Sequence, residues 1–145
     1  MASSEIFRGW RLSWVSTGLL VAGDTDSERF FALITRHIDA SGGDISAGIT
    51  SAARWAAAHL PIYSLNIVLT TPTGLFALRY HDTHDLLMPH RRAGGLHGHR
   101  HLDPGELLHV DRHLQIHTTI ALEHPPAHQL TLNDLGQLAA SQNQQ

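Results

Sequence analysis

The chain has 145 residues, of which 42% are apolar, so it is long enough to bury the core of one domain. Ten basic and 13 acidic side chains give a formal net charge of -3, which argues against a nucleic-acid partner, because phosphates are neutralised by basic patches. Cysteine is absent, which excludes disulfides, zinc sites built on thiolates and a cysteine nucleophile.

Residues 1–22 form a lead segment to which the sequence assigns no fold. Arg8 and Arg11 precede an apolar stretch at 12–22 that loosely imitates a signal peptide. Polar side chains such as Ser16 interrupt this stretch, and a membrane helix needs about 20 apolar residues in a row. We therefore expect a cytoplasmic protein that does not contact a membrane.

A helical hairpin is predicted after the lead segment. Thr25-Asp26-Ser27-Glu28 has the form of a capping box, and the apolar residues that follow it have helical spacing. Ser41-Gly42-Gly43 supplies the stop. A second helix is expected to begin at Asp44 and to end before Pro61, because a residue that precedes proline avoids the helical conformation.

Beyond Pro61 the apolar period changes from near 3.6 residues to two, which predicts strands. Residues 63–70 form the first strand, and Thr71-Pro72-Thr73-Gly74 is a turn signal in which proline presets the second position. The chain then returns as a strand over residues 75–80. The two strands therefore form an antiparallel hairpin with an apolar face made by Leu65, Ile67, Leu69, Phe76, Leu78 and Tyr80.

The pattern is lost over residues 81–104, which are predicted to be mostly loop with a possible short strand at 86–88. From 108 to 122 the even positions are largely apolar, which predicts a second pair of strands with a turn at Asp111-Arg112-His113. The opposite face of this pair is expected to meet water. That face carries His109, His113 and His117.

A short C-terminal helix is predicted over residues 131–140. Thr131 suits its N-cap, and Asp134 is placed to bond back to it. Residues 142–145 are expected to be a mobile tail. Together these elements predict an α+β protein in which a helical hairpin packs on an antiparallel sheet.

Asp26 is the carboxylate with the clearest chemical potential. It lies in the first turn of the first predicted helix, where the positive end of the helix dipole stabilises a negative charge. A carboxylate held in this way could bind the ammonium group of an amino acid. The same residue type is also common at ordinary helix starts, so the residue pattern by itself leaves both interpretations open.

Gly23-Asp24-Thr25-Asp26-Ser27-Glu28 resembles the GDTDSE segment of class II glutamine amidotransferases, which have an N-terminal nucleophile hydrolase fold. Later parts of the same domain are resembled by residues 63–66, the hairpin over 69–80, residues 104–111 and residues 130–132. The resemblance covers residues 23–141 as the C-terminal part of the catalytic domain, and it implies a partial α-β-β-α sandwich. In this family glutamine is hydrolysed to glutamate, and the ammonia is passed to an acceptor.

The resemblance also implies a role for Asp26, because the matching aspartate of the family binds the α-amino group of L-glutamine. The family's nucleophile, however, is an N-terminal cysteine whose free amino group serves as the base. This sequence has no cysteine, and residues 1–22 lack the His and Asn of the family's substrate and oxyanion motifs. We therefore assign no catalytic residue and no cofactor, and expect the chain alone to be catalytically incomplete.

Half of such a sandwich would leave a sheet face without its cover. We therefore expect a homo-oligomer, or a partner protein that supplies the missing sheet, although the lead segment at 1–22 could supply some of the cover. The apolar face expected to need cover carries Leu65, Ile67, Leu69, Phe76 and Leu78.

A non-enzymatic module is the alternative interpretation, either for protein assembly or for metal binding. His97, His99 and His101 alternate along the chain, so an extended backbone would direct all three to one side. Imidazoles suit zinc, nickel and copper. An exposed histidine-rich loop with only adventitious metal affinity has the same sequence, and the pattern does not separate the two.

Overall fold

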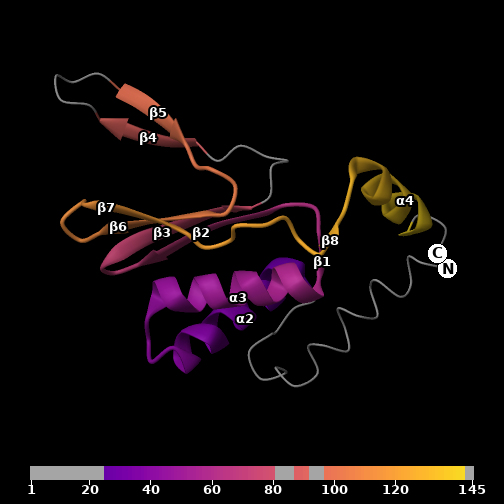
Figure 1. Ribbon diagram of the computed structural model, residues 1–145, viewed down its shortest axis with the longest axis horizontal. Coiled ribbons are helices and arrows are strands. Elements are labelled where there is room, and N and C mark those ends of the chain that lie inside the picture. Colours follow the sequence, from indigo (N-terminus) through magenta and orange to yellow (C-terminus); the bar gives the residue numbers. More distant parts are fainter. Residues whose placement is uncertain (1–24, 81–86, 92–96, 143–145) are drawn as a thin grey trace. The chain divides into compact units, whose positions relative to one another are not determined.

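The computed structural model describes residues 25–80, 87–91 and 97–142 and divides the chain into two compact units (Figure 1). The helical unit contains the three described helices and a two-stranded parallel sheet. The sheet unit, residues 64–125, contains a four-stranded antiparallel sheet and a further hairpin. The α+β class is therefore confirmed, whereas the predicted lead segment and the end of the predicted tail lie outside the described residues.

Helix α2 spans Asp26–Ala40 and begins as predicted. The Thr25 hydroxyl accepts a hydrogen bond from the Glu28 amide at 3.3 Å, and the Glu28 carboxylate accepts one from the Thr25 amide at 3.4 Å. Gly42 and Gly43 follow the helix with φ of 68° and 90°, a conformation that glycine adopts readily. Both the predicted capping box and the predicted stop are confirmed.

Helix α3 spans Ile45–His59 and lies beside α2 (Figure 1). Its start is also as predicted, because the Asp44 carboxylate accepts a hydrogen bond from the Ala47 amide at 2.9 Å. A Cβ atom at Gly48 would lie 2.4 Å from Ile38 Cγ1, so the two helices approach closely only because this residue is glycine. The buried apolar residues of the hairpin are Phe30, Ala32, Leu33, Ile34, Ile49, Ala52, Ala53, Ala56 and Ala57.

The helical unit is completed by chain segments that follow the sheet unit. Strand β1 (Pro61–Ile62) pairs in parallel with β8 (His128–Gln129). Two residues are too few to show strand periodicity, so the sequence did not predict this pairing. Helix α4 (Leu132–Gln142) begins as predicted, with the Thr131 amide donating to Asp134 at 2.7 Å. None of the helices within the described ranges has the length and apolarity needed to cross a membrane.

The four-stranded sheet has the order β2-β3-β6-β7, and all neighbouring strands are antiparallel. Strands β2 (Leu65–Thr71) and β3 (Gly74–Tyr80) form the predicted hairpin. Strands β6 (Glu106–Asp111) and β7 (Ile116–Ile120) form the second predicted pair, and β7 lies at an edge of the sheet. The sheet is open, because β2 and β7 do not pair with each other.

Within residues 81–104, the possible short strand at 86–88 corresponds to β4 (Leu87–Arg91), whereas β5 (His97–His101) was not predicted. Strand β4 pairs with β5. This hairpin follows β3 and precedes β6 along the chain, although β3 and β6 pair with each other in the sheet (Figure 1). A Gly-, His- and Arg-rich sequence lacks apolar alternation, so it gives no periodic signal. The backbone hydrogen bonds of a hairpin do not require that signal.

The strand register assigns side chains to two faces of the sheet. Ala77 lies opposite Leu108, and both are buried together with Leu102 on what we name the Ala77 face. Phe76 lies opposite His109, which defines the Phe76 face. The apolar face expected to need cover is the Phe76 face. Its central residues, Phe76 and Leu78, are buried within this chain, so they need no second chain to cover them.

The face of the second strand pair that was predicted to meet water is confirmed at His113 and His117, which are exposed, but not at His109, which is half-buried. The His109 ring stacks on Phe76 with ring centroids 4.3 Å apart and planes 6° from parallel, so His109 packs on an aromatic neighbour. On the Ala77 face, by contrast, Ile116 and Ile120 are 51% and 53% exposed. Alternation identified the two faces correctly, but the position of β7 at the sheet edge decided which side chains are exposed.

Candidate functional site

Asp26 is the first residue of α2, and its side chain is exposed. The capping hydrogen bonds of α2 are made by Thr25 and Glu28, so the cap does not use the Asp26 carboxylate. A negative charge at this end of a helix is stabilised by the helix dipole. The sequence-predicted ligand residue is therefore positioned to meet a cation from solvent.

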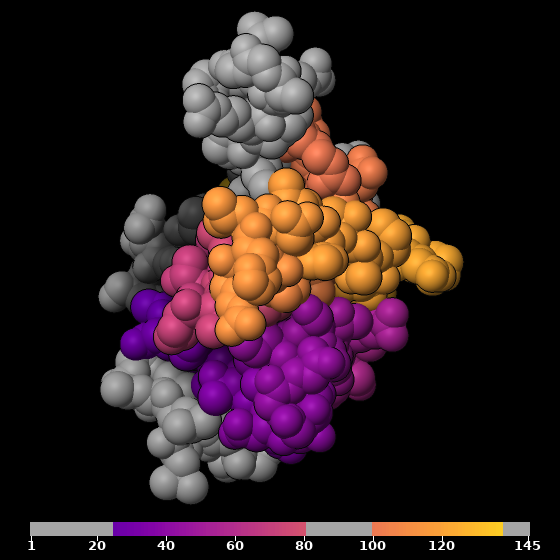
Figure 2. All heavy atoms as spheres, turned by 90° about the vertical axis from the view of Figure 1, so that its left-hand side faces the viewer, coloured from indigo at the N-terminus to yellow at the C-terminus, as the bar shows by residue number. Residues whose placement is uncertain are grey.

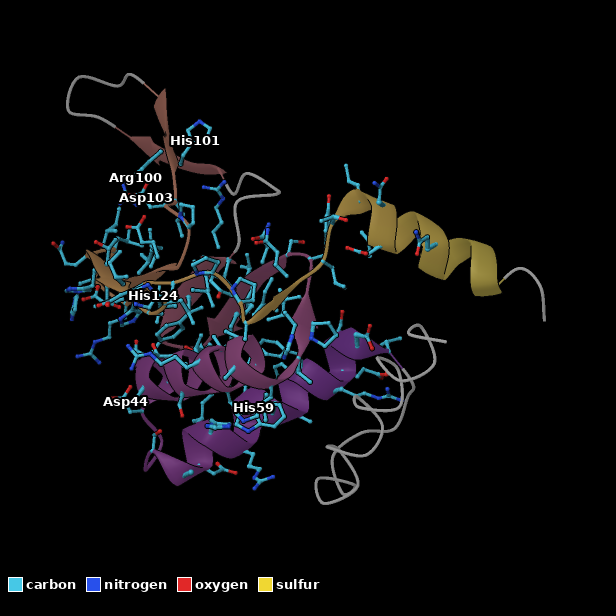
Figure 3. The ribbon with its side chains drawn as sticks, turned by 45° about the vertical axis from the view of Figure 1, so that its right-hand side comes forward. Asp44, His59, Arg100, His101, Asp103 and His124 are labelled. Atoms are coloured by element: carbon cyan, nitrogen blue, oxygen red, sulfur yellow. The ribbon has the colours of Figure 1, made fainter. Side chains whose placement is uncertain are left out.

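The histidines of β5 occupy the alternate positions that the sequence prediction required. His97, His99 and His101 are alternate residues of one strand. The side chains of His97 and His99 lie outside the described part, and that of His101 is exposed (Figure 3). Within the described residues, no group of three His, Cys, Asp or Glu is arranged to hold a metal ion. The metal site stays a prediction.

A buried ionic cluster at the base of the β4–β5 hairpin was not predicted. Glu106 and Arg79 are only 3% and 6% exposed. The Glu106 carboxylate forms an ion pair with Arg100 and accepts a hydrogen bond from the Asp103 amide at 2.9 Å. Arg79 Nη1 donates to the Leu102 carbonyl at 2.7 Å. Figure 3 labels Arg100 and Asp103 at this junction between β5 and the sheet.

This cluster has a structural role rather than a catalytic one. The Glu106 carboxylate already accepts hydrogen bonds from Arg100 and from the backbone, so it is not placed to take a proton from a ligand. Its burial costs free energy unless these partners are kept. A sequence signal did exist, because Arg79 interrupts an otherwise apolar strand and buried charges require partners.

A second polar group lies at the β6–β7 turn. Asp111 Oδ1 accepts hydrogen bonds from the amides of Gln115 at 3.0 Å and His113 at 2.8 Å. Its Oδ2 lies 3.3 Å from His117 Nε2, and the His117 ring centroid is 5.7 Å from that of His109. The Gln115 amide, with further hydrogen bonds from His117 and His113, lowers the pKa of Asp111. The turn therefore holds a stable carboxylate beside two imidazoles.

Comparison with known proteins gives no match, either to a family model, to a curated protein or to a solved structure. The fold class is therefore assigned from the structure alone, which is α+β with a helical hairpin and an open antiparallel sheet. The functional interpretation rests on the residues quoted for it and on the chemistry of the groups described above.

Proposed function

We propose that this chain is an amidotransferase-like domain that binds L-glutamine and does not hydrolyse it by itself. The observation that supports this most directly is the exposed Asp26 carboxylate at the start of α2, beside a cap made by Thr25 and Glu28. A carboxylate that is spared from capping is available for the α-ammonium group of an amino acid. The surrounding residues carry the resemblance to the amidotransferase segment.

The proposal also includes the specific fold, a partial α-β-β-α sandwich. The α2–α3 hairpin and the β2-β3-β6-β7 sheet would be two of the four layers of an α-β-β-α sandwich, and the remaining layers would come from another chain. The open sheet and the apolar side chains exposed on its Ala77 face are compatible with such an arrangement. The missing nucleophile would come from the same source, because this sequence has no cysteine.

Calorimetric titration with L-glutamine tests the proposal. We expect saturable binding to the natural chain and at least about 10-fold weaker binding to Asp26→Asn, since hydrogen bonds to charged groups contribute about 1.5–3 kcal/mol. Glu28→Gln is the matched control, because it removes one negative charge from the same helical turn without touching the assigned ligand.

Three outcomes are informative in this titration. Binding that Asp26→Asn weakens and Glu28→Gln keeps would support the site. Equal loss in both variants would indicate a general charge effect and contradict it. No binding at about 10 mM L-glutamine, which corresponds to a free energy weaker than about -3 kcal/mol, would reject glutamine as the ligand. Circular dichroism of both variants monitors whether α2 stays folded.

Protein assembly without catalysis is the second candidate function. It is favoured by the exposure of Val68, Ile116 and Ile120 on the Ala77 face, because soluble proteins rarely leave several apolar side chains of one face in water without a partner. Metal binding by the β5 histidines is tested separately by zinc titration. We would reject it if no stoichiometric uptake occurred below about 10 µM zinc.

A further inference from the structure

Strand β7 is an edge strand that is exposed along its whole length. All five of its residues, Ile116–Ile120, are exposed, whereas the other edge strand, β2, alternates between half-buried and exposed residues. The orange atoms of the β6–β7 region lie at the surface in Figure 2. No strand in the described part of the chain pairs with the outer side of β7.

Hydrogen bonds at both ends of β7 determine which of its backbone groups point outward. The Asp111 amide donates to the Gln115 carbonyl at 3.0 Å, and the Ala121 amide donates to the Gly105 carbonyl at 2.9 Å. Residues of an antiparallel strand alternate between bonding to the neighbouring strand and pointing away from it, so the odd-numbered residues of β7 bond to β6. The backbone groups that point away belong to Ile116, Thr118 and Ile120.

The composition of β7 lacks the features that normally protect such an edge. Natural edge strands carry lysine, proline, inward-pointing charges or bulges that discourage pairing. The Ile116–Ile120 segment contains no Asp, Glu, Lys, Arg or Pro, and four of its five residues are β-branched. Two negatively charged copies of the chain can therefore meet here without like-charge contacts between the strands.

We propose that two copies of this chain pair through their β7 strands, antiparallel and with Thr118 on the twofold axis. In this register, Thr118 faces its own counterpart, and Ile116 of one copy lies opposite Ile120 of the other. All three residues then form hydrogen-bonded pairs, and the exposed isoleucines pack beside each other on the Ala77 face. The two sheets join into one continuous sheet.

The same argument is weaker for β2. A symmetric β2 pair would bring only one large exposed apolar residue per copy into contact, Val68, between the polar residues Asn66 and Thr70. Strand β7 contributes two isoleucines per copy. A contact limited to two short strands is at or below the roughly 1,200 Å² of the smallest stable interfaces, so we expect a dissociation constant between about 10 µM and 1 mM.

This inference rests on the assembly candidate and is independent of glutamine binding. Amide hydrogen exchange at low and high protein concentration tests it without any substitution. We expect the amides of Ile116, Thr118 and Ile120 to become protected as the concentration rises, while those of His117 and Thr119 are protected throughout by β6. Exchange that does not depend on concentration at these three amides would overturn the β7 pairing.

Proline variants provide the matched test by sedimentation equilibrium. Thr118→Pro removes an outward-pointing amide that the β6–β7 ladder does not use, and we expect at least about 10-fold weaker dimerisation. Val68→Pro makes the same change on the opposite edge and should leave the dimer intact. A dimer that survives Thr118→Pro would overturn the edge pairing while keeping the assembly function, whereas a natural chain that is monomeric at about 1 mM would reject both.

Discussion

The α2–α3 hairpin and the β2-β3-β6-β7 sheet differ in where their apolar side chains end up. Among the described residues, the hairpin exposes one large apolar side chain, Phe31, whereas the sheet unit exposes four. Those in the sheet unit are Val68, Leu114, Ile116 and Ile120. The hairpin buries its apolar positions through contacts between neighbouring segments, but the fate of a strand's side chains depends on its place in the sheet.

The difference shows that equal sequence periodicity does not mean equal burial. Leu108 on the central strand β6 is completely buried, while Ile116 on the edge strand β7 is half exposed, although both lie on the Ala77 face. A central strand has neighbours on both sides, and an edge strand has one. Close approaches occur at Gly48 in the helical unit and at Gly74 and Gly105 in the sheet unit. Substitutions at Gly48 and Gly105 test the comparison most strongly.

The largest effect is expected for Gly105→Ala in the sheet unit. Gly105 has φ of 82°, and an added Cβ would lie 1.9 Å from the Leu122 carbonyl oxygen. Left-handed strain and the backbone clash together should lower the free energy of unfolding by about 3 kcal/mol or more. Urea unfolding followed by circular dichroism measures this.

Gly42→Ala separates the two causes of that loss. Gly42 also has positive φ, but no atom lies within 4 Å of its added Cβ, so we expect a cost of only about 1 kcal/mol. Equal costs for Gly42→Ala and Gly105→Ala would show that the Leu122 contact is unimportant.

Gly48→Ala should cause the next largest loss in the free energy of unfolding, in the α2–α3 hairpin. In an exposed helix this change adds about 1 kcal/mol of stability, but at Gly48 the new methyl group meets both the side chain and the backbone of Ile38. We expect a net destabilisation of about 2 kcal/mol. Gly136→Ala in α4 is the control, because its Cβ meets nothing and should stabilise that helix by about 0.5–1 kcal/mol. A stabilising Gly48→Ala would contradict the close helix approach.

A smaller effect of opposite sign is expected for Leu114→Gly at the β6–β7 turn. Leu114 is 80% exposed and has φ of 61°, a left-handed conformation that disfavours leucine. Removing its side chain should raise the free energy of unfolding by about 1 kcal/mol, measured by thermal denaturation. Arg112→Gly in the same turn, which has no positive φ, should lower stability instead. Destabilisation by Leu114→Gly would mean that the side chain makes a stabilising contact.

The smallest effect concerns the pH dependence of the hairpin. His37 Nδ1 lies 2.8 Å from Ser51 Oγ across the two helices. Burial, with a contribution from the neighbouring Arg36, lowers the pKa of His37 in the folded state. The unfolded chain therefore binds more protons than the folded chain. The stability that neutral His37 contributes is fully present above about pH 6.5 and is lost as the pH falls below that value. The free energy of unfolding, measured from pH 7.5 to 5, should depend less steeply on pH in His37→Gln than in the natural chain. An unchanged pH dependence would contradict this assignment.

The local features of the chain were predictable from sequence because their partners are close in the chain. The caps at Thr25 and Thr131 depend on residues three positions away, and the turn after Thr71 depends on the next three residues. Strand β5 and its pairing with β4 were missed, since the polar residues of β5 give no alternating apolar pattern. The bond from Arg79 to the Leu102 carbonyl was missed because its two residues are 23 positions apart along the chain.

The sequence by itself determined the helix boundaries, the main strand hairpins and the position of Asp26 in the first turn of α2, because these follow from capping, periodicity and turn chemistry. Only the tertiary structure decided which face of each strand is buried, that His109 stacks on Phe76, and that β7 lies at an edge. The physical reason is that a strand's alternation distinguishes two faces but carries no information about what packs on either. That outcome depends on long-range pairing, which brings together segments distant in the chain.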